Sequence, residues 1–123
     1  MTHRIKKVVV LGSGIMGSGI SCHLANVGLE VLMLDLASKD AKDVNQIANN
    51  ALNNAIKAKP APLYLDSFAK NITTGNFEQD MHKISEADWI IEVVVERLDI
   101  KQKIYEQVET YRHPSISIQE LRT

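Results

Sequence analysis

The sequence has little that would mark a secreted, membrane-bound or nucleic-acid-binding protein. It contains a single cysteine, Cys22, so no disulfide can form within the chain and a reducing compartment is expected. The formal net charge of −1 offers no general attraction to nucleic acid or to an anionic membrane. The apolar run Val8–Leu11 stops at Gly12, which is too short for a signal core of about 7–15 residues or a membrane span of about 20. We therefore expect a cytoplasmic protein that binds neither nucleic acid nor membrane.

What is present is the composition of an ordinary globular domain. The chain has 123 residues, of which 45% are hydrophobic and 24% are charged. This length fits one domain, residues 1–123, which buries roughly two thirds of the surface of its unfolded chain.

The first 35 residues have the pattern of a strand, a turn, a helix and a second strand. Residues 6–11 contain a short apolar, β-branched run that is typical of a strand buried on both faces. Apolar residues at helical spacing then predict a helix over 15–27, and Gly28 stands where a left-handed helix end belongs. Residues 31–34 predict the next strand. Together they form one βαβ unit.

The rest of the chain continues the alternation. We expect a helix within 37–59, strands near 72–74 and over 89–96, an amphipathic helix from about 99 to 111, and a last strand from about 116. Asparagines on the 37–59 helix predict a solvated face; they are Asn45, Asn49, Asn50, Asn53 and Asn54. Alternating strands and helices predict an α/β fold with a Rossmann-type, doubly wound parallel sheet between two helical layers.

The most informative motif lies between the first strand and the first helix. Its residues are Gly12, Ser13, Gly14, Ile15, Met16 and Gly17. Gly12 permits the tight turn, Gly14 lets the backbone approach a pyrophosphate, and Gly17 lets the helix pack closely. The amides and the positive dipole end of the helix attract the phosphates, so no basic patch is needed.

An acidic residue follows at the expected distance. Asp35 ends the second strand, 18 residues after Gly17, close to the about 20 that separate this turn from a ribose-binding carboxylate. Its charge would repel a 2′-phosphate, so NAD is favoured over NADP. FAD uses a similar first turn, and only later motifs argue against it.

Two stretches of the chain resemble one enzyme family. Residues 8–20, which contain the glycine turn, and residues 88–96, followed by Lys101, are similar to segments of the 3-hydroxyacyl-CoA dehydrogenases. The resemblance runs from about residue 5 to about residue 114. It is strongest to the dehydrogenase part of multifunctional fatty-acid β-oxidation proteins.

The resemblance implies an oxidoreductase that interconverts L-3-hydroxyacyl-CoA and 3-ketoacyl-CoA with NAD. It places the glycine turn on the pyrophosphate, Asp35 on the adenosine ribose, Glu96 and Lys101 beside the nicotinamide ribose, and Val93 in the cofactor cleft. It also implies an acyl-CoA substrate and homo-oligomeric full-length relatives. The simpler interpretation of Glu96 and Lys101 is a surface ion pair.

No residue of this chain matches the catalytic residues of the family. The resemblance places a serine, a histidine–glutamate pair and an asparagine beyond residue 118, where residues 119–123 do not fit the family pattern. We assign no catalytic residue and no metal ligand. We expect a domain truncated before a C-terminal helical domain, able to bind NAD but unable to turn over alone.

Two alternatives stay open at this point. Hydroxyisobutyrate- and phosphogluconate-type dehydrogenases share the glycine turn with a methionine before its last glycine. A stand-alone nucleotide-sensing or interaction module would also bind NAD and lack catalytic residues.

Overall fold

The computed structural model describes most of the chain. The described residues are 5–38, 42–57, 66–93, 98–116 and 118–120.

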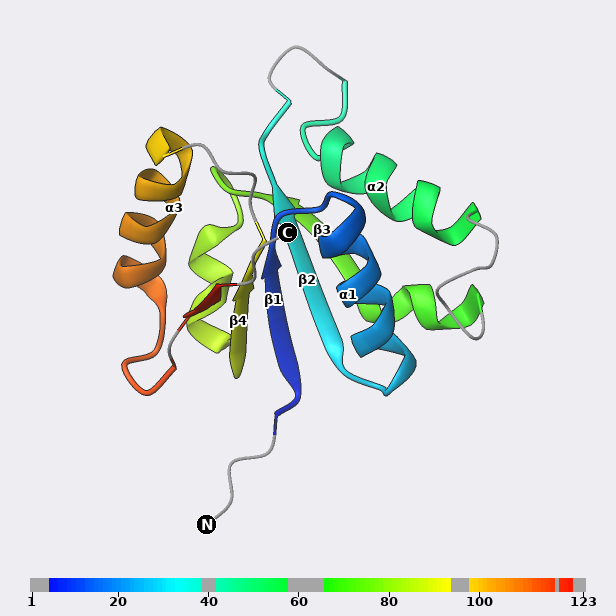
Figure 1. Cartoon of the computed structure of the whole chain (residues 1–123), viewed down its shortest axis with the longest axis horizontal. Helices are drawn as coiled ribbons and strands as arrows, with labels where there is room; N and C mark the ends of the chain where they lie inside the picture. The colour runs from blue at the N-terminus through cyan, green and yellow to red at the C-terminus, as the bar shows by residue number, and fades with distance from the viewer. Residues whose placement is uncertain (1–4, 39–41, 58–65, 94–97, 117, 121–123) are drawn as a thin grey trace.

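Five parallel strands form one sheet, and their order is β3-β2-β1-β4-β5 (Figure 1). The strands are β1 (Lys7–Leu11), β2 (Glu30–Asp35), β3 (Ile72–Asn76), β4 (Trp89–Glu92) and β5 (Ile118–Glu120). The chain moves outward from β1 to β3, then returns to the other side of β1 for β4. The order therefore reverses between β1 and β4, which is the switch point of a Rossmann-type sheet. The predicted fold class is confirmed.

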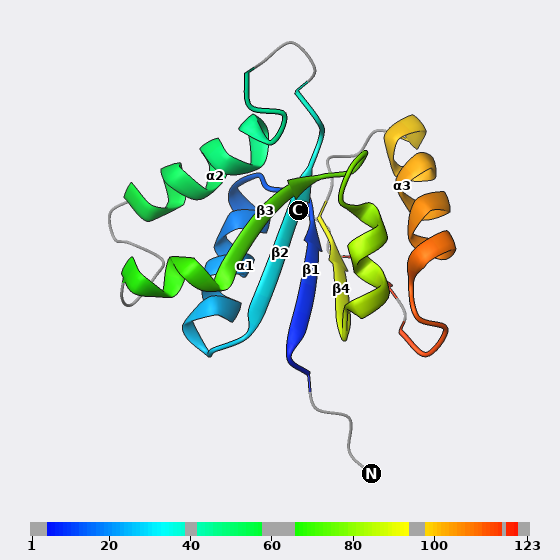
Figure 2. The same ribbon diagram turned by 180° about the vertical axis from the view of Figure 1, so that it is seen from behind.

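Helices cover both faces of the sheet (Figures 1 and 2). The helical elements are α1 (Ile15–Asn26), α2 (Gln46–Lys57), η1 (Asp66–Asn71), η2 (Met81–Glu86) and α3 (Leu98–Tyr111). Side chains of successive β1 residues point to opposite faces, so Val8 and Val10 pack in one core cluster with α1 while Val9 packs in a second with η2 and α3. The strand is buried on both faces, as its β-branched sequence predicts.

The first helix ends as predicted, whereas the second begins later. Gly28 has φ 88°, the left-handed conformation that suits a helix end. Helix α2 starts at Gln46 because Asp43 forms a turn before it: its carboxylate accepts the amide of Asn45 at 2.9 Å and Nδ2 of Asn49 at 2.7 Å.

The asparagines predicted on a solvated helix face are not all exposed, and Asn45 precedes α2. Asn49 accepts a hydrogen bond from the hydroxyl of Thr74, and Oδ1 of Asn45 accepts one from Nδ2 of the fully buried Asn76 at 2.7 Å. The prediction was wrong for these two residues because β3 lies beside them, which a helical pattern alone does not show. Asn50, Asn53 and Asn54 are exposed.

None of the helices in the described part of the chain has the length and apolar character needed to cross a bilayer.

Candidate cofactor-binding site

The glycine turn lies at the carboxyl end of β1, beside the end of β2. Gly12 donates its amide to the carbonyl of Leu34 at 2.7 Å. Its φ of 115° lies in the left-handed region that only glycine adopts without strain. The turn is thus attached to β2 through its backbone.

Gly17 lies where a side chain has no room. A Cβ at this position would lie 2.0 Å from the carbonyl oxygen of Gly12 and 3.1 Å from Cγ2 of Val93. The first turn of α1 therefore packs directly on the backbone of the preceding turn. This close approach is the role that the sequence predicts for the third glycine.

Gly14 has a different environment. Its φ of −58° suits any residue, and a Cβ there would meet nothing within 4 Å. Gly14 is the N-cap of α1, without a capping side chain, and the first helical turn contains no acidic residue. The start of α1 therefore presents unopposed backbone amides and the positive dipole end to open space, which fits an anionic group such as a diphosphate.

Asp35 and the glycine turn are in direct contact. Oδ2 of Asp35 accepts hydrogen bonds from the amide of Ser13 at 2.8 Å and from its hydroxyl at 2.5 Å. Oδ1 accepts the amide of Leu36 at 2.7 Å. The carboxylate is thus fixed at the edge of the turn, and the structure brings together the two features that the sequence pairs.

The remaining two residues of the motif differ in exposure. Ile15, the first residue of α1, is 97% exposed, whereas Met16 is half-buried and packs against the core. An apolar side chain that projects fully into solvent beside the helix start adds apolar surface to the edge of the site.

The β4 side of the switch point supplies the other predicted residues. Val93 is buried, donates its amide to the carbonyl of Leu11 at 2.9 Å, and lies against Gly17. Lys101 lies in the first turns of α3, and its Nζ is 3.5 Å from Oε1 of Glu92. Glu96 lies outside the described residues.

Two residues that the sequence did not single out belong to this side. Glu92 is 1% exposed, and its Oε1 also accepts the hydroxyl of Tyr105 at 3.1 Å. This buried carboxylate is therefore one partner of Lys101. A signal was available: a lone glutamate inside the apolar run 89–95, followed by a lysine and a tyrosine four residues apart, one turn of the same helix.

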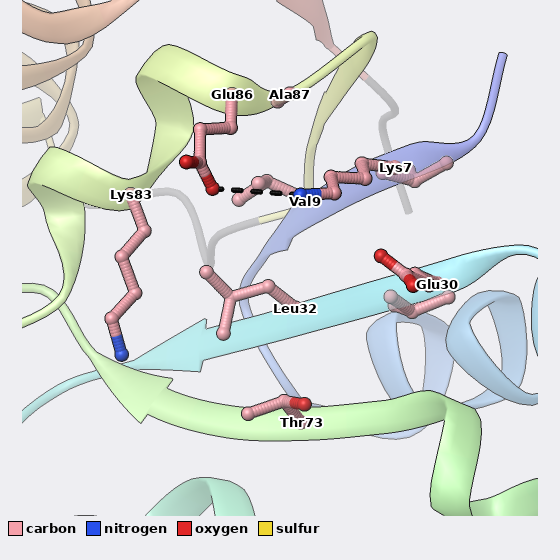
Figure 3. Close-up of a pocket in the computed structure, with 10 residues that line it drawn as sticks. Lys7, Val9, Glu30, Leu32, Thr73, Lys83, Glu86 and Ala87 are labelled. Carbon is pink, nitrogen blue, oxygen red and sulfur yellow. Dashed lines mark ion pairs between the residues drawn. The ribbon is translucent and has the colours of Figure 1, made fainter.

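A small pocket lies elsewhere, towards the amino ends of the strands (Figure 3). Lys7 and Glu30, which begin β1 and β2, line it, and Nζ of Lys7 is 3.6 Å from the carboxylate of Glu86. Open α/β sheets bind ligands at the carboxyl ends of their strands, so this pocket is separate from the candidate site.

Comparison with known proteins supports a nucleotide-binding site in this domain. Residues 7–119 match the family described as the NAD binding domain of 3-hydroxyacyl-CoA dehydrogenase. The chain is 44% identical over 126 residues to a probable 3-hydroxyacyl-CoA dehydrogenase of Bacillus subtilis, covering 91% of this chain and 16% of that protein. It is 44% identical over 111 residues to a putative fatty acid oxidation complex trifunctional enzyme of Rickettsia felis, covering 90% of this chain and 15% of that protein.

A solved structure shows the same fold. The (S)-3-hydroxybutyryl-CoA dehydrogenase PaaH1 from Ralstonia eutropha is similar with a TM-score of 0.66 and 26% identity, over 95% of this chain and 41% of that one. The chain thus spans less than half the length of each of these three proteins. Because the family match covers nearly the whole chain, the predicted family is confirmed: the chain belongs to the NAD-binding domains of the 3-hydroxyacyl-CoA dehydrogenases.

Proposed function

We propose that this chain binds NAD across the carboxyl edge of its sheet, at the switch point between β1 and β4. One observation carries the proposal: the start of α1 is packed through Gly17 onto Gly12 and faces open space at Gly14, beside a carboxylate fixed by Ser13. A diphosphate fits the helix start, and a ribose fits the carboxylate.

The individual roles follow from these positions. The backbone of residues 12–17 holds the pyrophosphate, and Asp35 accepts hydrogen bonds from the hydroxyls of the adenosine ribose. Since the adenosine half lies over β2, the nicotinamide half extends towards β4, where we assign Val93, Glu96 and Lys101. A negative charge at Asp35 disfavours the 2′-phosphate of NADP.

At the level of the whole protein we propose an oxidoreductase acting on 3-hydroxyacyl-CoA. NAD supplies the hydride acceptor for oxidation of the 3-hydroxyl group, and this chain's residues bind and orient it. We propose residues 1–123 as the single cofactor-binding domain of such a protein, in the cytoplasm, with the acyl-CoA site and the subunit contacts formed outside it. The family names of the relatives support this assignment.

Titration of the chain with NADH, followed by calorimetry, tests the proposed cofactor. We expect binding of NADH and much weaker binding of NADPH. Asp35→Ala should weaken NADH binding by at least about ten-fold, because charge-assisted hydrogen bonds to the ribose are lost. Glu30→Ala is the matched control, since Glu30 begins the same strand at the opposite edge of the sheet and is exposed. A preference for NADPH, or equal losses in the two variants, would contradict the assignment.

A second assay tests whether this chain binds the cofactor without catalysing the reaction. The isolated chain, mixed with NADH and acetoacetyl-CoA, should show no loss of absorbance at the nicotinamide band. Steady oxidation of NADH would show that the catalytic groups lie within this chain.

A further inference from the structure

Glu92 is a buried charge at the edge of the proposed cofactor site. It is the last residue of β4 and is in register with Leu11, the last residue of β1 before the glycine turn. The next residue, Val93, lies against Gly17. Glu92 therefore directly precedes the residue of the β4 side that contacts the glycine turn.

This position does not need a charge for stability. The preceding residues of the strand, Ile90 and Ile91, are fully buried and apolar, and an apolar side chain at position 92 would continue that pattern. Removing a carboxylate from water is costly, and a buried ion pair is often no more stable than a well-packed apolar replacement. The charge therefore indicates a role other than stability.

The contacts of Glu92 indicate what that role is. Its Oε1 faces two side chains of α3, Nζ of Lys101 at 3.5 Å and the hydroxyl of Tyr105 at 3.1 Å. Lys101 has a flexible stem of four carbons, and an unpaired lysine at an edge would sample many rotamers. The side chain of Lys101 is only 13% exposed, and its ammonium group lies at the sheet edge within ion-pair distance of this carboxylate.

We propose that Glu92 is a positioning residue for the nicotinamide half of NAD. It holds Lys101 beside the switch point, so that the ammonium group is in place when the cofactor binds, and Tyr105 fixes the carboxylate. This inference rests on the proposed function, because the direction of the nicotinamide follows from the placement of adenosine over β2.

The first experiment needs no cofactor. The chain is treated with a limiting amount of acetic anhydride, and acetylation of each lysine is measured by mass spectrometry. Lys103, exposed on the same helix, is the internal control. In Glu92→Gln we expect acetylation of Lys101 to rise by at least about five-fold relative to Lys103, because the loss of this carboxylate makes the amine both more mobile and more nucleophilic. An unchanged ratio would show that Glu92 does not hold Lys101.

The second experiment compares NADH with ADP, which shares the adenosine and diphosphate but has no nicotinamide. Glu92→Gln should bind NADH about ten-fold more weakly and ADP within two-fold of the original affinity. A merely structural role would weaken both ligands together, and that result, like an unchanged NADH affinity, would overturn the proposal.

Tyr105→Phe is a milder second variant, which tests the proposal even if Glu92→Gln fails to fold. It removes one hydroxyl and keeps the ring, and it should give the same pattern with a smaller loss, about three-fold for NADH alone. If the original chain binds neither NADH nor ADP, the proposed function fails, and the acetylation ratio still decides whether Glu92 holds Lys101.

Discussion

The two sides of the switch point are built differently. On the β1 side the site consists of backbone: the Gly12 carbonyl against Gly17, the Gly12 amide on β2, and the open helix start at Gly14. On the β4 side it consists of charged side chains, with Glu92 facing Lys101 from α3. In the proposed site, amides whose positions the fold sets bind the diphosphate, whereas the β4 side depends on a charge placed by contacts between two elements. On the β1 side an added atom at Gly17 has no room, and on the β4 side the loss of one charge leaves its buried partner without that ion pair.

Gly17→Ala breaks the backbone side most directly. A methyl group 2.0 Å from a carbonyl oxygen forces α1 away from the turn, so we expect a loss of at least about 3 kcal/mol in the free energy of unfolding and loss of NADH binding. Urea denaturation and calorimetry measure both. Gly19→Ala is the control, because a Cβ there meets nothing within 4 Å, and it should stabilise the helix by about 0.5–1 kcal/mol. Similar effects of the two changes would contradict the close approach.

Lys101→Met breaks the charged side. It removes the cation that a buried carboxylate faces, and we expect a loss of about 3 kcal/mol in the free energy of unfolding. Lys103→Met, on the exposed face of the same helix, should show no measurable change. The double variant Glu92→Gln with Lys101→Met should recover part of the loss, since it no longer buries an uncompensated charge. If the loss of stability in the double variant equalled the sum of the losses in the two single variants, the two residues would not be coupled.

Asp80→Asn tests how a carboxylate outside the candidate site contributes to stability. Partial burial raises the pKa of Asp80, but hydrogen bonds from Lys83 and from the amide of Asn76 outweigh it, so the pKa lies below its ordinary value. The unfolded state then binds the proton more readily, so the stabilisation is present above the ordinary aspartate pKa of about 4 and is lost as the pH falls below it. We expect the variant to lose about 1 kcal/mol at pH 7 and to match the original protein near pH 2. A difference that persists in acid would refute this account.

Ser13→Ala should have an effect no larger than that of Asp80→Asn, and it separates the contribution of the side chain from that of the backbone on the β1 side. The hydroxyl bond to Asp35 is removed while the amide bond at 2.8 Å remains. We expect a loss of about 1 kcal/mol in the free energy of unfolding. Ser85→Ala, at an exposed position in η2, serves as the reference. A loss as large as that of Gly17→Ala would mean that the hydroxyl, and not the backbone, holds the turn together.

Sequence reasoning anticipated the β1 side in detail and the β4 side only in part. The three glycines, the strand before them and Asp35 after them are local features with one physical interpretation each, and the structure brings them into contact. Glu92 was missed because a glutamate in an apolar run could be an exposed residue or a buried one, and periodicity does not decide between them. Its partner lies across the packing of α3 on the sheet.

The asparagines in and just before α2 show the same limit. Helical spacing placed Asn45 and Asn49 on one element, but their burial depends on β3, which follows more than twenty residues later. Polar side chains satisfy their hydrogen bonds wherever partners are available, so their surroundings are decided by tertiary packing.

The alternation of strands and helices, the glycine turn and the acidic residue that follows it could be derived from the sequence, because they depend on backbone conformation and on spacing along the chain. The contact of Lys101 with Glu92 and the hydrogen bonds from Ser13 to Asp35 became visible in the folded chain. Both depend on distances between elements, and a hydrogen bond or an ion pair forms only when packing brings its two groups within about 3–4 Å.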